Sequence, residues 1–137
     1  MKNNKEGKKN ILKKLCVWII GILIIQYFLG MTSNLFVTFP TSGTQTQLWE
    51  FAWHQVPVTL HIVVGTLLLV LSVIILIVAI NNKMKKRTIS GIVGLLSIFI
   101  AGFSGAQFVS SQNNIYSFIM SIFFIIALVS YTLVIGS

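Results

Sequence analysis

The chain has almost no acidic residues. Among its 137 residues there is no aspartate, and the two carboxylate side chains belong to Glu6 and Glu50. The absence of aspartate excludes a Ser-His-Asp triad, and no Gly-rich phosphate loop, CxxC pair or HExxH sequence occurs either. Most general acid–base catalysis relies on carboxylates or on histidines paired with them. An enzyme is therefore the least favoured class of function, although the sequence does not decide the question.

Charge and cysteine are also scarce. Charged residues make up 9% of the chain, hydrophobic residues make up 55%, and the mean hydropathy is +0.91. A soluble domain carries roughly 25% charged residues, because its surface must face water. This composition excludes most soluble domains and indicates that lipid is the solvent. The single cysteine, Cys16, cannot form an internal disulfide and is interpreted as a small packing residue, with acylation as the alternative.

The positions of the charges divide the chain into spans. Six lysines fall within residues 1–14 and four basic residues within residues 83–87, and the stretches between and after them contain Glu50 alone as a charged residue. A helix needs about 20 apolar residues to cross the hydrocarbon core of a bilayer. The sequence thus predicts an all-α integral membrane four-helix bundle over residues 15–137, preceded by a basic tail at 1–14. The predicted spans are residues 15–37, 56–80, 88–109 and 115–135.

The basic clusters also predict the orientation. Cytoplasmic loops carry the excess of Lys and Arg, so the N-terminal tail and the loop at 81–87 are expected on the cytoplasmic side, together with both termini. The loops at 38–55 and 110–114 contain no Lys or Arg and are expected outside. We therefore predict a multi-pass protein of the cell membrane, a bacterial inner membrane, with the bilayer as its first partner. No aromatic residues interleave with the cations, which argues against nucleic-acid binding and for contacts with lipid headgroups.

The third span has small residues on one face. Close backbone approach is what holds helices together in lipid, so this face is expected to pack on its neighbours. Phe99 and Phe103 are expected elsewhere on the helix surface. If the small face pointed outward from the bundle instead, it would favour docking to another membrane protein. Its members are Ser90, Gly94, Ser97, Ala101, Ser104 and Gly105.

Polar, small and sulfur-bearing residues gather near the predicted outer ends of all four spans. The inner halves of the spans are mostly aliphatic. Because polar groups inside a membrane need partners, this distribution predicts an outward-facing site between the helices. The contributing segments are residues 26–34, 54–61, 102–107 and 116–121.

The two histidines, His54 and His61, are the leading candidates for ligands. A spacing of seven would place them on one face of a continuous helix, about 10.5 Å apart along its axis. Pro57 allows two alternatives, since the span either starts near it or follows an interfacial helix from Gln47 that kinks there. One interpretation is a neutral histidine hydrogen-bonded between helices. The other is a metal ligand, because imidazole suits haem iron, copper and zinc.

A cofactor would need space and a second ligand. Gly65, Gly102 and Gly105 remove bulk beside the histidine face and predict a slot for a flat macrocycle. Met120 and Met31 lie at about the right depth to be the second ligand, although a methionine is often simple core filler. Two histidines on one straight helix could not grip the same iron, but a symmetric homodimer could supply both. The cofactor stays unknown, with haem b or copper as the alternatives.

The order of these residues carries a faint resemblance. Trp53-His54, Pro57, His61 and Gly65, followed by a basic loop and by Gly102-Phe103-Ser104-Gly105, resemble small four-span bacterial membrane proteins of unassigned function. The arrangement is also similar to four-helix membrane b-type cytochromes, namely the b561-like group and the half-bundles of haem A synthase. That similarity implies haem ligation by His61 and, more weakly, by His54. In those cytochromes the ligating histidines lie on different helices.

Three functions remain open. The favoured one is an accessory or structural subunit of a larger membrane complex, which needs a membrane-protein partner but no chemistry. The alternative is a haem- or copper-binding protein in electron transfer or haem handling, with His61 as ligand near the outer face. The second alternative is a small transporter subunit, although the intramembrane carboxylate or broken helix typical of ion transport is not evident.

Overall fold

The chain folds entirely into helices and short connections over the part that the structure describes. A computed structural model gives the backbone of residues 2–136 and the side chains of residues 6–136, so Lys2 and Lys5 of the predicted tail lie outside the described side chains. The predicted all-α class is confirmed. The helices are α1 (Lys2–Phe36), α2 (Gln45–His54), α3 (Val56–Asn81), α4 (Lys85–Ser111) and α5 (Asn114–Gly136).

Four of these helices are long and apolar enough to cross a membrane. The spans cover Glu6–Phe36, Val56–Asn81, Lys85–Ser111 and Asn114–Gly136, so the chain is a multi-pass membrane protein. All four agree with the predicted spans to within a few residues, except at the start of the first. There the segment predicted as a separate tail is helical and continuous with α1. Lysine is a good helix former, which explains why the helix does not stop where the charge begins.

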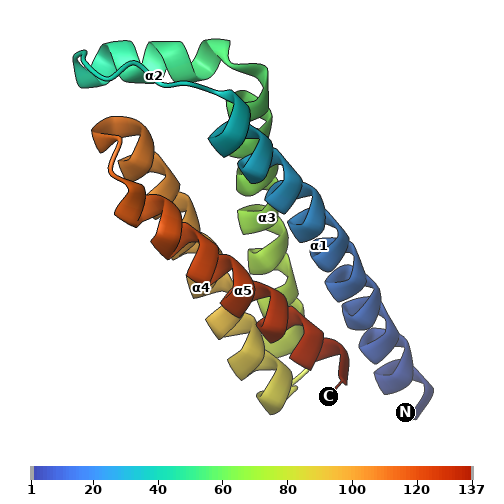
Figure 1. Ribbon diagram of the computed structural model, residues 1–137. Helices are drawn as coiled ribbons and strands as arrows, with labels where there is room; N and C mark the ends of the chain where they lie inside the picture. The colour runs from blue at the N-terminus through green and yellow to red at the C-terminus, as the bar shows by residue number, and fades with distance from the viewer. Residues whose placement is uncertain (1, 137) are drawn as a thin grey trace.

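The four spans form a closed ring of neighbours (Figure 1). Helix α1 packs against α3 and α5, and α4 packs against the same two helices from the opposite corner. The short helix α2 lies across one end of the bundle and contacts α3 and α4. We call this end the α2 end. The opposite end carries the basic N-terminal part of α1 and the turn between α3 and α4, and we call it the basic end.

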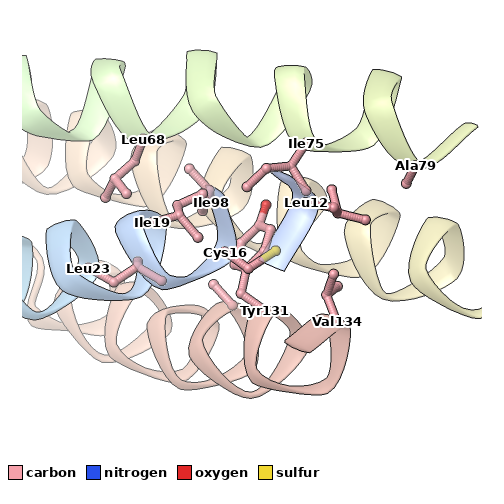
Figure 2. Close-up of a cluster of buried hydrophobic side chains, with 11 residues drawn as sticks. Leu12, Cys16, Ile19, Leu23, Leu68, Ile75, Ala79, Ile98, Tyr131 and Val134 are labelled. Carbon is pink, nitrogen blue, oxygen red and sulfur yellow. The ribbon is translucent and has the colours of Figure 1, made fainter. Parts of the chain in front are cut away.

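The aliphatic core fills the half of the bundle nearer the basic end (Figure 2). Tyr131 of α5 is fully buried there between the other helices. Cys16 is also fully buried, in agreement with its interpretation as a packing residue. The remaining labelled members are Leu12, Ile19, Leu23, Leu68, Ile75, Ala79, Ile98 and Val134.

The small-residue face of α4 points into the bundle, as expected. Gly94, Ser97 and Ser104 are buried, whereas Phe99 and Phe103 are exposed on the outer surface. At Gly94 the fit is especially close, because a Cβ atom there would lie 2.7 Å from the Cζ atom of Tyr131. The face is therefore used within the bundle, and it does not provide the outward surface that would favour docking.

The chain bends sharply between α2 and α3, and this bend separates the two histidines. Thr44 caps the start of α2 in a capping box with Gln47, and α2 ends at His54. Gln55 is extended, with φ −92° and ψ 109°, and Pro57 then sits in the first turn of α3, where its missing N–H costs nothing. Each of the two alternatives is observed in part: the span starts at Val56, and it follows a separate helix, which begins at Gln45. The condition for both histidines to share one face, a continuous helix, is not met, because they belong to different helices.

Candidate functional site

A small cavity lies between the helices at the α2 end. Its volume is about 80 Å³, and all four spans and α2 contribute to its wall. This is the place where the sequence predicts a site, although binding there stays a prediction. The polar and sulfur-bearing members of the wall are Ser33 and Asn34 of α1, Trp49 of α2, His61 of α3, and Ser117 and Met120 of α5.

His61 is the most distinctive residue of the cavity wall. Its ring lies against the backbone of α1 at Gly30, where a Cβ atom would come within 2.9 Å of the imidazole Cε1. The absence of a side chain at Gly30 thus leaves the room that the imidazole ring occupies. The Nδ1 atom is buried and has no hydrogen-bond partner within the described part of the chain. Leaving a buried polar atom unpaired costs about 1–3 kcal/mol, and such atoms in native proteins usually have an ordered water or ion nearby.

A hydrogen bond from α1 fixes the backbone beside this ring. The side-chain amide of Gln26 donates from Nε2 to the carbonyl oxygen of His61, at 2.9 Å. Gly65 makes this possible, since a Cβ atom there would lie 3.1 Å from the same Nε2 atom. Gly65 therefore makes room for a glutamine of the neighbouring helix. It does not line the cavity, in contrast to the predicted slot for a macrocycle.

Met120 and Gly105 face each other in the wall of the cavity. A Cβ atom at Gly105 would lie 3.4 Å from the Met120 sulfur, so the absent side chain leaves room for the thioether. Both residues line the same cavity as His61. The structure thus brings together three of the predicted site residues, an imidazole, a thioether and the glycine beside it.

The other predicted site residues lie elsewhere. His54 is exposed on α2, and its Nδ1 is 2.7 Å from the carbonyl oxygen of Glu50 in its own helix. Met31 is exposed at 38%, and Gly102 is exposed, with no atom within 4 Å of the place that a Cβ would occupy. His54 therefore does not line the cavity that contains His61, and its role as a ligand stays a prediction. Within the described residues, no group of three or more His, Cys, Asp or Glu side chains could hold a metal ion.

Helix α2 covers the cavity and is tied to α4. The indole Nε1 of Trp49 and the amide Nε2 of Gln45 both donate to the hydroxyl oxygen of Ser110, at 3.1 Å each. Leu48 and Ala52 are buried on the inner side of the same helix. Their spacing of four is a signal that could have identified an inward face of this helix.

The size of the cavity limits what it can hold. An engineered cavity of about 150 Å³ in another protein accepts one benzene molecule, and sites for drug-sized ligands occupy roughly 300–1,000 Å³. At about 80 Å³, the cavity accommodates a few water molecules or one metal ion, but not a haem macrocycle. The residues present therefore do not fit a haem at this position.

Comparisons with known proteins add no relative. No family model, no curated protein and no solved structure matches the chain. The resemblance to b-type cytochromes accordingly has no support from homology. What the structure establishes is a four-span helical membrane protein with a small, histidine-lined cavity under α2.

Proposed function

We propose that the protein binds a single soft metal ion, copper(I), in the cavity at the α2 end, with His61 and Met120 as its protein ligands. The observation that carries this proposal is the placement of an imidazole with an unpartnered buried nitrogen in the same cavity wall as a thioether. A metal ion or water is the usual explanation for such an unpaired atom.

The chemistry of the wall favours copper over other metals. Hard ions such as Mg²⁺ and Ca²⁺ need carboxylate or carbonyl oxygens, and no carboxylate is among the described residues that line the cavity. Structural zinc takes four ligands from cysteine, histidine and carboxylates, of which the wall offers one. Thioethers select copper(I), and imidazole also suits copper. Copper and haem are alternatives for the same residues, and a cavity volume of about 80 Å³ favours copper.

Metal analysis of the purified protein tests this proposal. Protein from copper-supplied cells is expected to carry about one copper per chain, measured by elemental mass spectrometry. His61→Ala and Met120→Leu should each reduce that ratio at least tenfold. His54→Ala is the matched control, because it removes the other histidine from an exposed position, and it should leave the ratio unchanged.

Two results would contradict the proposal. One is a wild-type protein without copper above the level of a mock purification. The other is equal copper loss in the His54 and His61 variants, which would indicate surface adsorption. An absorption spectrum of the same sample with a Soret band sensitive to His61→Ala would favour the haem alternative, despite the small cavity.

An accessory role in a larger membrane complex is the second candidate. One observation favours it: Gly102 of α4 is exposed, as are Phe99 and Phe103 of the same helix, and beyond its own stretch of helix no described atom lies within 4 Å of the place that its Cβ would occupy. A small residue on a lipid-facing surface lets a helix of another protein approach closely. The buried face of α4 gives this candidate no further support.

Affinity purification from native membranes tests the second candidate. A partner that contacts this surface should be retained by the wild type and lost at least fivefold in Gly102→Leu. Val93→Leu is the control, because it enlarges another exposed position of α4 by one methylene. A partner retained equally by both variants would show that Gly102 is not part of the contact.

A further inference from the structure

The basic end of the bundle contains a second, larger pocket. It is open to the outside, has a volume of about 530 Å³, and lies between the N-terminal part of α1 and the turn that joins α3 to α4. Six cationic side chains line it, and no carboxylate is among the described residues that do so. The cations are Lys8 and Lys9 of α1 and Lys83, Lys85, Lys86 and Arg87.

Arg87 differs from the other cations because it is buried. It is 3% exposed, whereas the five lysines of the pocket are exposed. One guanidinium nitrogen, Nη1, lies 3.8 Å from the sulfur of Met84, which is a weak acceptor. The other, Nη2, is buried and has no hydrogen-bond partner among the residues that the structure describes. A buried charge without a partner is strongly unfavourable, so this guanidinium lacks an anion.

The start of α4 also gathers positive charge without an anion beside it. Lys85, Lys86 and Arg87 are the first three residues of the helix, and the N-cap residue Met84 makes no side-chain hydrogen bond to it. The first N–H groups of a helix have no partner within the helix, and the macrodipole makes this end positive. Cations are unfavourable there and anions favourable. Three cations in a first turn without any acidic residue therefore favour the binding of an anion there.

The tight turn before α4 brings these groups to one side. Lys83 adopts a left-handed conformation, with φ 53°, and its N–H donates to the carbonyl of Ile80. The N–H of Met84 donates to the carbonyl of Ala79, so α4 begins directly after the turn. The exposed lysines and the buried arginine consequently line the same pocket, where Lys8 and Lys9 complete it from α1.

We propose that this pocket is a binding site for a phosphate-bearing anion, held by the buried Arg87 guanidinium and the first turn of α4. A guanidinium presents paired N–H donors that match the geometry of a phosphate, which explains an arginine at the buried position and lysines at the rim. The phosphate group belongs either to the headgroup of an anionic phospholipid or to a free phosphate. A basic pocket at a helix end next to the bilayer suits the lipid well.

The site goes beyond general attraction between lysines and an anionic membrane. That attraction acts through exposed charges, is shared by all of them, and is screened by salt within about 10 Å at 0.1 M. A site built on Arg87 instead concentrates the affinity on one buried residue. General attraction predicts a similar loss of affinity whichever cation is removed. A site built on Arg87 predicts a much larger loss when Arg87 is removed, and this difference can be measured.

Lipid binding by the full-length protein in detergent provides the test. Dioctanoyl phosphatidylglycerol should bind with one molecule per chain, counted by native mass spectrometry, and should raise the midpoint of thermal unfolding. Dioctanoyl phosphatidylcholine, which has the same chains but no net charge, should do neither. Arg87→Gln should weaken the apparent Kd for phosphatidylglycerol at least tenfold. Lys14→Gln removes one charge from α1 outside the pocket and should change it less than twofold.

Inorganic phosphate identifies the source of the anion. If phosphate at millimolar concentration binds the wild type and displaces phosphatidylglycerol in an Arg87-dependent manner, the site is confirmed with free phosphate as its occupant. If phosphatidylglycerol binds and phosphate does not displace it, the site is confirmed for the lipid. Equal weakening by Arg87→Gln and Lys14→Gln, or equal binding of both lipids, would overturn the proposal.

A second variant covers the case in which Arg87→Gln does not fold, as judged by circular dichroism. The double variant Lys83→Gln with Lys86→Gln keeps the buried guanidinium and removes two exposed charges from the rim. It should weaken the Kd for phosphatidylglycerol about fivefold while its binding remains one molecule per chain. Loss of one-to-one binding in this variant would overturn the proposal, because the affinity would then lie in the exposed charges and not in Arg87.

Discussion

Substitution of Gly94 by alanine is expected to destabilise the bundle at the contact between α4 and α5. The added Cβ atom would lie 2.7 Å from Cζ, 2.8 Å from Cε2 and 3.0 Å from the hydroxyl oxygen of Tyr131. Non-bonded carbons are most favourable at about 3.5–4.0 Å, so the overlap is close to 1 Å. Tyr131 has no exposed surface, and its ring cannot move away without displacing α1 or α3.

The expected magnitude follows from two opposing terms. Overpacking a filled core costs about 1–3 kcal/mol, and an overlap with a fully buried ring belongs at the upper end of that range. Alanine is favoured over glycine in a helix by roughly 1 kcal/mol, which offsets part of the cost. The net loss should be about 2 kcal/mol, measured as a lower free energy of unfolding in detergent.

A control variant and a double-mutant cycle test whether the loss of stability comes from the contact between Gly94 and Tyr131. Gly102→Ala is on the same helix, has nothing within 4 Å of its Cβ, and should be neutral or slightly stabilising. In the Tyr131→Leu background, Gly94→Ala should lose most of its cost, which gives a coupling energy of about 1–3 kcal/mol in a double-mutant cycle. If Gly94→Ala and Gly102→Ala have the same effect on stability, the close contact with Tyr131 does not exist as described.

Three further predictions concern the cavity, its cover and the orientation. Gly30→Ala should displace the His61 ring, since the new Cβ would lie 2.9 Å from Cε1, and should lower bound copper at least fivefold while the helical circular dichroism signal is retained. Ser110→Ala removes the acceptor of both hydrogen bonds between α2 and α4, so amides of α2 should exchange hydrogen roughly tenfold faster, and unchanged exchange would mean that these bonds do not hold α2. In intact cells the wild type should not react with an impermeant maleimide, because Cys16 is fully buried. Ser42→Cys should react from outside, and labelling only after permeabilisation would invert the predicted orientation.

The membrane spans could be predicted because they depend only on the order of charged and apolar residues along the chain. Charges at residues 2–14 and 83–87 and polar turns elsewhere leave apolar stretches of the right length, and lipid allows few other structures for such stretches. The inward face of α4 was also predictable, since its small residues recur at the helical period. Both inferences need only the position of a residue along its own helix.

The composition of the site was only partly predictable, because it depends on how helices rotate against one another. His61 and Met120 were placed at a similar depth, and the structure brings them to one cavity. Met31 has a similar depth but faces outward, and depth alone does not distinguish the two cases. Gly65 could not be assigned either, since its neighbour is Gln26 of a different helix.

Arg87 is the clearest residue that the sequence did not single out. As one of four cations in a short run, it was interpreted as a contact for lipid headgroups like its neighbours. It is buried in the structure, four residues after the left-handed turn residue Lys83. The one available signal was chemical: it is the only arginine in a chain with nine lysines.

The break at Gln55 has a consequence for insertions and deletions in this chain. Because the helical hydrogen bonding stops there, the rotational phase of α3 is set by its own packing and not by the length of the segment before it. A residue gained or lost in 37–54 would alter the loop or α2 yet leave the imidazole of α3 aimed as before. A residue inserted between Ile62 and Val63 would turn His61 by about 100° around the helix axis relative to the rest of α3. The stretch of α3 between the imidazole and the buried Leu68 should therefore tolerate changes of residue type far better than changes of length.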